Sequence, residues 1–457
     1  MSAVRASARS RTALALLCAV VFLDSMDLSL MGVALPDIQR DLSLPGGTLQ
    51  WLVSGYAVAY GGFLLLGGRL ADLFGRRRLF LASLAVFAAA STAGGLLSAG
   101  ELLVASRVVK GVAAALTAPA ALSLITTTFA EGPARNRALG IYSLAGAAGY
   151  SAGLVLSGLL TQVHWRLVFF VPVPVVLLVL VIAPLVLPRD AAGRARPRGF
   201  DSGGAIAVTG GVLLLVYALT QRSWLIGAVA LALLGSFVLV ERRHRAPLVP
   251  LDIFRSRTVS TANLAGIAWA CATIGWQFVA VLYLQDELGY GPLSIGLGIM
   301  PMGIAILAAA NVAGRMITRW GLWRVAALGM LLQAGGILLF VRADGTSDYA
   351  TMLLPALLVH GVGNGLSFPS LNIAAVSGVP DDRQGLASGL ITSAVQIGAG
   401  VGVAILAALL ATESGLAGYR AAFLAAAGFS LLGAVVAGLG LRAPARRGVP
   451  ALASDDL

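Results

Sequence analysis

Four ionisable residues lie inside strongly apolar stretches of the chain, where a charged group is costly. Asp24 and Asp27 are three positions apart in the first stretch, and Arg107 and Lys110 are three apart in the fourth. Residues three apart on a helix share a face. Each ionised side chain costs about 2.5–3.5 kcal/mol at the centre of a membrane-spanning helix. We therefore expect the acidic face and the basic face to meet and to form ion pairs across a cavity.

Such an ion pair could act as a proton switch. Protonation of Asp24 or Asp27 would remove the negative charge and break its pairing with Arg107 or Lys110. We therefore predict a proton-coupling role for these four residues, and which aspartate carries the proton stays open. The alternative is a static ion pair that only orients the two helices.

Polar and aromatic residues in the second half of the chain could line a substrate cavity. A mixed aromatic and polar lining suits varied lipophilic ligands. Core packing or lipid contact is the alternative for the tryptophans, and hydrogen bonding within helix packing is the alternative for the lone intramembrane histidine. The predicted cavity residues are Trp269, Trp276, Gln277, Asn311, His360, Asn364 and Gln396.

The composition indicates an integral membrane protein. Hydrophobic residues make up 58% of the chain and charged residues 11%, with a mean hydropathy of +0.90; soluble domains carry about 25% charged residues. The net charge of +12 does not indicate a nucleic-acid partner, because the basic residues form short clusters between apolar stretches. We expect the lipid bilayer to be the main surrounding of an all-α chain.

Apolar windows of about 20 residues predict fourteen spanning helices. The prediction divides the chain into a six-helix bundle (1–187), a linker with two extra helices (188–257), a second six-helix bundle (258–441) and a cytoplasmic tail (442–457). The windows centre near residues 20, 59, 87, 115, 149, 177, 212, 231, 272, 303, 332, 358, 398 and 431.

Basic residues are unevenly distributed over the predicted connections. Most of the 32 Lys and Arg residues lie in the two tails and the even-numbered connections, and cytoplasmic segments carry this excess. We therefore expect a multi-pass protein of the cell membrane with both termini in the cytoplasm. The opposite connections carry only Arg40, Arg166, Arg222, Arg342 and Arg420.

Internal repeats predict two related halves. Gly68–Arg78 recurs as Gly314–Arg324, and Lys110-Gly111-Val112 recurs as His360-Gly361-Val362, at offsets of 246 and 250 residues. Transporters are often built from such repeats. Duplication of a six-helix unit, with two helices inserted between the copies, accounts for all fourteen windows.

Several of these motifs resemble the fourteen-helix drug:proton antiporter branch of the major facilitator superfamily. The resemblance is carried by Met26-Asp27-x-Ser29 and by Arg107-x-x-Lys110-Gly111, and above all by the segment from Gly68 to Arg77. It implies the fold of that superfamily. It also implies that a conformational switch lies between the second and third helices, formed by Gly68, Asp72, Gly75, Arg76 and Arg77. Gly75 would independently permit a tight reversal there.

The chain departs from the branch on the fifth helix. The antiporter motif there lacks its proline and reads Gly153-Leu154-Val155-Leu156-Ser157-Gly158, so we expect a helix that bends less. Gly149, Gly153 and Gly158 would form a gating helix. Gly149 and Gly153 have a small-x-x-x-small spacing that predicts close contact between the halves.

The resemblance implies proton-coupled efflux of lipophilic drugs or antibiotics by a monomer, driven by the proton gradient without a cofactor. A proton symporter or facilitator that imports a nutrient is the first alternative, and a non-transporting sensor or a membrane enzyme is the second. No metal ligand set or phosphate loop is evident, and His164, His244 and His360 are unhelpfully spaced, so we do not expect an enzyme. The substrate and its charge stay open.

Overall fold

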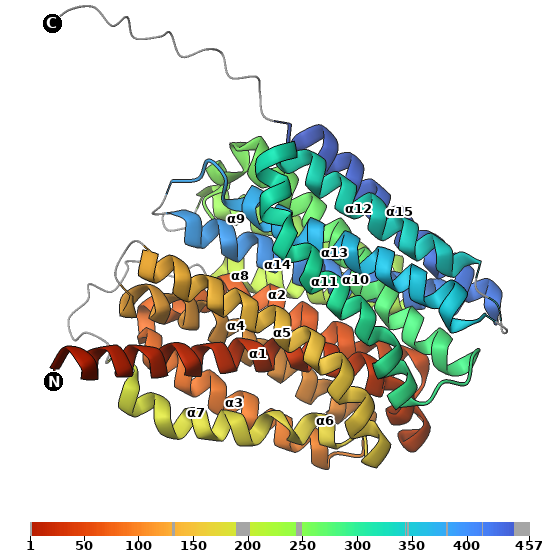
Figure 1. The fold of residues 1–457 in the computed structure, drawn as a ribbon, viewed down its shortest axis with the longest axis horizontal. Helices are drawn as coiled ribbons and strands as arrows, with labels where there is room; N and C mark the ends of the chain where they lie inside the picture. The colour runs from red at the N-terminus through yellow and green to blue at the C-terminus, as the bar shows by residue number, and fades with distance from the viewer. Residues whose placement is uncertain are drawn as a thin grey trace, which may run out of the picture.

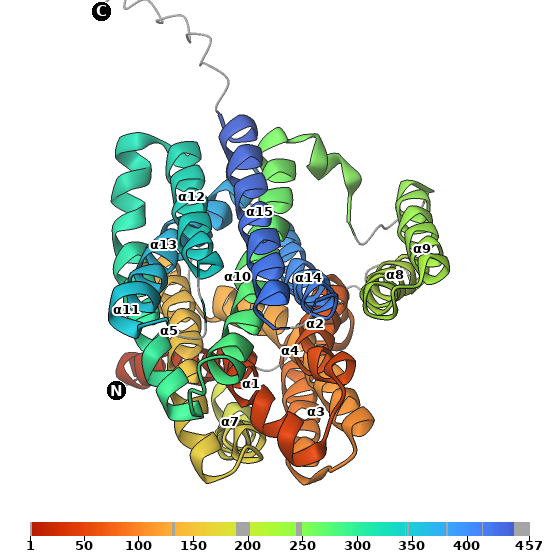
Figure 2. The same cartoon turned by 90° about the vertical axis from the view of Figure 1, so that its right-hand side faces the viewer.

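Helices make up all the regular structure in the described part of this computed structural model (Figures 1 and 2). The description covers residues 2–129, 133–188, 202–243, 249–342, 344, 347–380, 383–413 and 415–442. The main helices are α1 (Ser2–Leu42), α2 (Gly46–Phe74), α3 (Arg76–Leu96), α4 (Gly100–Thr128), α5 (Pro133–Val163), α6 (Leu167–Phe170), α7 (Pro172–Val186), α8 (Ser202–Gln221), α9 (Trp224–Arg243), α10 (Arg257–Asp286), α11 (Pro292–Trp320), α12 (Leu322–Val341), α13 (Leu354–Val376), α14 (Gln384–Leu410) and α15 (Leu416–Gly440). The short helices η1 (Leu251–Arg255) and η2 (Tyr349–Leu353) precede α10 and α13.

Each of the fourteen predicted windows centres on a helix. Within the described residues, 11 helices are long and apolar enough to cross a membrane, or 12 if the two arms of α5 count as one span. The apolar part of α8 is shorter, from Ile206 to Leu219. The chain is therefore a multi-pass membrane protein.

The helices form two bundles that meet along two seams. In the first half, α1–α7, helix α1 packs on α5 and α4 packs on both α2 and α3; in the second half, α10–α15, helix α10 packs on α14 and α13 packs on both α11 and α12. Helix α2 contacts α14 and helix α5 contacts α11, and these contacts join the halves. Figure 1 shows the first half below the second.

Equivalent glycines make equivalent contacts in the two halves. A methyl group on Gly149 would meet the backbone of Phe22, and one on Gly398 would meet the backbone of Ile267. Gly153 likewise faces Met26 of α1. The small residues thus let α1 approach α5, and α10 approach α14, inside each half. The prediction that the α5 glycines contact the other half is therefore corrected.

Glycines on α2 and α14 make the close contact between the halves. A methyl group on Gly61 would lie 2.9 Å from Cβ of Gln396, and one on Gly400 would collide with Val58. The seam between α2 and α14 therefore depends on small residues that no quoted motif contained.

Helix α5 bends although the proline of the branch motif is absent. Its axis turns by 41° between the segments Leu144–Tyr150 and Val155–Val163. Gly153 lies between these segments, and the Ser157 hydroxyl donates to the Leu30 carbonyl of α1 at 2.5 Å. Glycine and serine are common at helix bends. Helix α5 therefore bends without a proline, and whether it bends less than a helix with the branch proline stays a prediction.

The inserted helices α8 and α9 pack against each other and lie beside the two halves (Figure 2). Helix α8 contacts α2 and α14, and the Thr209 hydroxyl donates to the Gly62 carbonyl at 2.9 Å. Arg222, between α8 and α9, donates to the Ala408 carbonyl of α14 at 2.8 Å. The pair therefore contacts both halves at one seam. Residues 189–201, 244–248 and 443–457 lie outside the described part.

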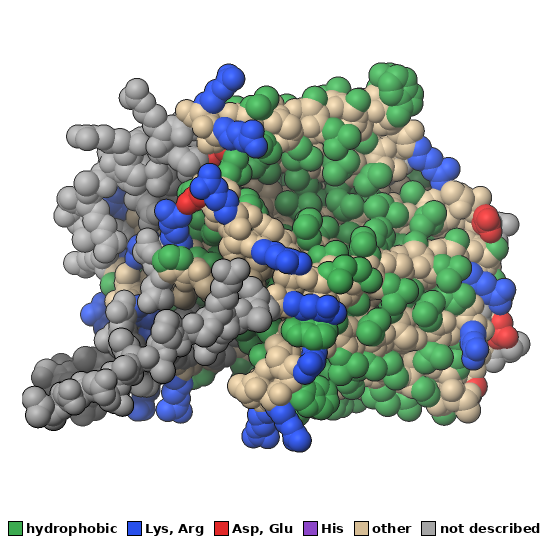
Figure 3. All heavy atoms as spheres, turned by 90° about the horizontal axis from the view of Figure 1, so that it is seen from above, with side chains coloured by type: hydrophobic (Ala, Val, Ile, Leu, Met, Phe, Trp, Pro, Cys, Tyr) green, Lys and Arg blue, Asp and Glu red, His purple; other side chains and the backbone are tan. Residues whose placement is uncertain are grey.

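The predicted switch segment forms a sharp reversal between α2 and α3. Gly75 has φ = 94°, and Gly321, its repeat counterpart between α11 and α12, has φ = 85°. Few residues other than glycine adopt this conformation. The surroundings of Gly68 and of the Asp72 side chain lie outside the described part, so the predicted role of these two residues is untested. Figure 3 shows that Lys and Arg side chains gather toward the end of the bundle that holds the amino terminus in Figure 1.

Candidate functional site

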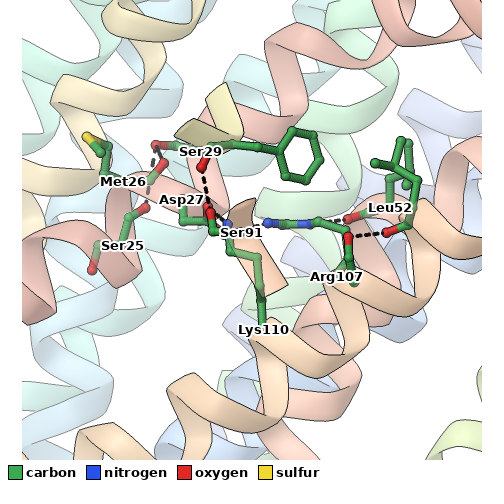
Figure 4. A network of polar contacts seen from close by, with 11 residues as sticks. Ser25, Met26, Asp27, Ser29, Leu52, Ser91, Arg107 and Lys110 are labelled. Atoms are coloured by element: carbon green, nitrogen blue, oxygen red, sulfur yellow. Dashed lines mark hydrogen bonds and ion pairs between the residues drawn. The ribbon is translucent and has the colours of Figure 1, made fainter. Parts of the chain in front are cut away.

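A buried ion-pair centre joins α1 and α4 in the middle of the first half (Figure 4). One carboxylate oxygen of Asp27 accepts a hydrogen bond from Arg107 Nη1, and the other accepts from Lys110 Nζ. Asp27 is 2% exposed, and both cations are fully buried. The structure therefore brings together three of the four residues that were predicted to meet.

Neighbouring groups hold both cations in place. Arg107 Nε donates to the Leu52 carbonyl of α2 at 2.8 Å, and its guanidinium carbon lies 4.5 Å from the ring centre of Tyr56. Lys110 Nζ lies 4.7 Å from the ring centre of Phe87. Cations gain energy over aromatic faces, most of all where water is excluded. These contacts partly offset the cost of burying two positive charges beside one carboxylate.

Asp24 differs from the expected pattern. It is 7% exposed and sits one turn before Asp27 on α1, yet it makes no ion pair and no hydrogen bond with any residue in the described ranges. The cost of a buried unpaired carboxylate is large. The two cations share Asp27, so the sequence pattern identified the correct helices but not the pairing.

In the second half, uncharged side chains stand at the repeat positions of Lys110 and its neighbour Phe87. His360, the repeat counterpart of Lys110, stacks on Trp276 with ring centres 4.2 Å apart. Gln333, the counterpart of Phe87, donates from its amide to the Thr273 hydroxyl. Both His360 nitrogens and Trp276 Nε1 are buried and have no hydrogen-bond partner among the residues that the structure describes. Trp276 and His360 therefore pack together in the bundle, and neither lines the two cavities described below.

The remaining predicted cavity residues are dispersed. Trp269 is buried and stacks on Phe368 with ring centres 4.9 Å apart. Asn311 is exposed and donates to the Leu307 carbonyl of its own helix. Asn364 and Gln396 are buried, and neither lines the two cavities described below.

A cavity of about 690 Å³ opens between the halves at the helix ends opposite the chain termini. Its lining comes from the α1–α2 turn, the ends of α10 and α14, and the start of α15. The lining residues include Gln39, Gln50, Arg222, Phe278, Leu282, Asp286, Glu287, Glu413 and Tyr419. We call this cavity the vestibule.

A small inner pocket of about 10 Å³ lies next to the vestibule and shares Phe278 with it. Within this pocket the Tyr150 hydroxyl of α5 donates to the Gln277 amide oxygen of α10, which joins the two halves. Leu28, the neighbour of Asp27, also lines it. Gln277 was predicted to line a substrate cavity; it lines this small pocket, and its role with substrate stays a prediction. Tyr150 was missed; only its position beside Gly149 could have pointed to it.

The described residues contain no cluster of three or more His, Cys, Asp and Glu side chains that could hold a metal ion. The charged groups that the structure brings together at the centre are the Asp27 carboxylate and the Arg107 and Lys110 cations. A change of charge at Asp27 would act on α1 and α4 together, because its two oxygens contact two cations on α4.

The comparisons with known proteins agree with this architecture. The family model of the Major Facilitator Superfamily matches residues 17–403 and 264–455. The chain is 37% identical to the cephamycin export protein CmcT of Amycolatopsis lactamdurans over 93% of its own length and 90% of that protein. It is 34% identical to the lincomycin resistance protein of Streptomyces lincolnensis, over 97% and 94% of the two chains.

Solved structures share the fold at low sequence identity. A bacterial homologue of the human lysosomal transporter Spinster, in an inward-facing and unoccupied conformation, aligns with a TM-score of 0.69 at 15% identity and covers 95% of this chain and 97% of its own. The matched family and relatives are transporters and not enzymes. With a family match over most of its length and relatives that are similar over nearly all of it, the chain belongs to the major facilitator superfamily.

Proposed function

We propose that this protein exports lipophilic drugs or antibiotics across the cell membrane in exchange for protons. The observation that carries this proposal is the similarity over nearly the whole chain to a cephamycin export protein and a lincomycin resistance protein. The buried centre at Asp27 supports the coupling to protons, because its single carboxylate pairs with two buried cations and the net charge of the site rises by one when that carboxylate binds a proton.

The proposal includes fourteen spanning helices with both termini in the cytoplasm. Helices α2 and α8, which are not among the 12 apolar spans above, are 29 and 20 residues long, enough to span about 30 Å. Arg-rich segments on the side of the termini support this orientation. In this orientation the vestibule opens to the outside of the cell, and the proposed energy source is the inward proton gradient.

The proposed cycle begins with Asp27 ionised and paired. A proton that enters from the vestibule binds Asp27 and cancels its charge, so Arg107 and Lys110 lose their counter-charge. The two cations then favour a different position of α4 relative to α1. Because α1 packs tightly on α5 and α5 contacts α11 across the seam, this movement can reach the second half. The predicted switch segment at Gly75, Arg76 and Arg77 would act at the cytoplasmic end.

Reconstitution in liposomes tests this function. The panel would contain lincomycin, a cephamycin and a set of lipophilic cations, neutral compounds and anions, since relatives are named for the first two. Internal pH and compound movement are recorded together under an imposed pH gradient. Opposite fluxes of protons and compound support antiport. Parallel fluxes, or movement that ignores the gradient, would favour import or facilitated diffusion and contradict the proposal.

A further inference from the structure

One indole ring lies beside two guanidinium groups at the end of the second half that is near the carboxyl terminus. The guanidinium carbon of Arg324 lies 5.1 Å from the ring centre of Trp323, and that of Arg442 lies 4.8 Å from it. Both arginines are exposed, and neither has an ion-pair partner in the described part of the chain. We call Trp323, Arg324 and Arg442 the arginine–tryptophan cluster.

The corresponding end of the first half uses its arginines differently. Arg77, the repeat counterpart of Trp323, donates to the Pro184 carbonyl at 2.5 Å, and Arg9 donates to the Val186 carbonyl at 2.9 Å. Both bonds satisfy carbonyls in the last turn of α7, where a cation is favourable. The arginines at this end of the first half therefore have acceptors within the protein.

In the second half, a different arginine takes that role. Arg257 donates to the Leu439 carbonyl in the last turn of α15 at 2.7 Å. The second half also lacks the counterpart of Asp72, because Thr318 stands at that repeat position. Apart from one long contact of 3.5 Å from Arg324 Nη1 to the Trp320 carbonyl, Arg324 and Arg442 donate no hydrogen bond to a residue in the described part of the chain.

We propose that the arginine–tryptophan cluster binds the phosphate of an anionic phospholipid in the leaflet on the side of the termini. Trp323 lies in the first turn of the apolar helix Leu322–Val341, at the height where tryptophan meets lipid head groups. Guanidinium groups bind phosphate through two parallel hydrogen bonds. The first turn of α12 also has no side-chain cap, so its amide groups add donors beside the arginines.

The test measures phosphatidylglycerol binding to the full-length protein in phosphatidylcholine nanodiscs, by native mass spectrometry and by association of a spin-labelled lipid. The double variant Arg324→Gln with Arg442→Gln should bind phosphatidylglycerol about thirtyfold more weakly, since each basic residue near a membrane surface contributes about fivefold. Trp323→Leu should weaken binding without any change of charge. A cooperative unfolding transition, measured for each variant in nanodiscs that contain only phosphatidylcholine, shows that the variant is folded.

The matched control is Arg315→Gln with Arg319→Gln, two exposed residues on the neighbouring helix α11. It removes the same charge from the same end and should leave the affinity nearly unchanged. Equal losses in the two double variants would show general attraction to a basic surface and overturn the proposal, as would no loss in either. Displacement of the lipid by inorganic phosphate would assign the site to a free anion and also overturn it. The proposal does not depend on the transport function.

Discussion

The polar centres of the two halves occupy related places but have opposite character. In the first half, Asp27 binds Arg107 and Lys110 in a fully buried charged centre. In the second half, neutral His360 stacks on Trp276 at the repeat position of Lys110. Contacts between helices repeat closely, so the duplication preserved the backbone scaffold while the side chains at its centre diverged.

This difference suggests a division of labour under the proposed function. When one proton binds a buried carboxylate, the energy of the cations paired with it changes strongly. A cluster of uncharged side chains in an apolar bundle has no such counter-charge to lose. The first half would then hold the proton-responsive centre, and the second half would provide the moving partner and much of the vestibule wall. The predictions below test this contrast from the largest expected effect to the smallest.

Asp27→Asn should have the largest effect. It leaves Arg107 and Lys110 buried without a counter-charge, which costs about 3–5 kcal/mol in unfolding free energy, and it should abolish proton-driven transport. Denaturation in micelles and flux in liposomes measure the two effects. Adding Lys110→Met to Asp27→Asn should restore much of the stability but not the coupling. Recovery of coupling in that double variant would reduce Asp27 to a static ion-pair partner.

His360→Lys would place the first half's cation in the neutral centre of the second half. Within the described residues no carboxylate contacts His360, so we expect a loss of about 2.5–3.5 kcal/mol in stability, the cost of an unpaired charge in the bilayer core. Thermal unfolding checks this expectation, with His360→Gln as the neutral control. An unchanged melting temperature for His360→Lys would mean that the second half can hold a charge as well as the first.

Lys110→Gln should have an intermediate effect. Arg107 still neutralises Asp27, so the fold should survive, but one charged hydrogen bond is lost, which is worth about 1.5–3 kcal/mol. We expect pH-driven flux to fall about tenfold or more. Replacement by glutamine at the repeat position, His360→Gln, should alter the pH-driven flux by about twofold or less. If both variants lose equal activity, the two centres contribute equally.

Tyr150→Phe should have a smaller effect, because it removes one hydrogen bond to Gln277 between the halves. A neutral hydrogen bond contributes about 1 kcal/mol, so the population of states with a closed inner pocket should fall a few-fold. Distances between spin labels on the two halves measure this change. In Gln277→Leu, the additional change Tyr150→Phe should have no further effect on those distances.

The exposed ion pair of the second half should matter least. Arg383 donates to Asp252 at 2.6 Å and lowers the pKa of that carboxyl below its usual 3.8. A lowered folded pKa means that the pair stabilises the fold above the unfolded value of about 3.8. This contribution disappears as pH falls through the lower folded value. Arg383→Ala should therefore lower the melting temperature slightly at neutral pH, with the difference vanishing in acid.

The sequence predicted the scaffold better than the site. Apolar windows and repeats located the helices because these patterns extend over whole segments. The pairing at Asp27 followed from the cost of buried charge, yet the unpaired state of Asp24 did not, because helix rotation decides which carboxylate faces α4. The spacing of Trp276 and His360 could not reveal that they stack on each other. Tyr150 carried no motif, and its role depends on how the halves meet.

The most direct test of the central claim is proton release on ligand binding. The purified protein is first equilibrated, in weakly buffered detergent, at a pH acidic enough to protonate Asp27. It then receives the compound with the highest flux in the liposome panel, and a pH indicator records the protons released per protein. We predict release from the wild type and from His360→Gln, and none from Asp27→Asn with Lys110→Met. Full release from the variant without Asp27, or its loss in His360→Gln, would contradict the assignment of proton coupling to the first half.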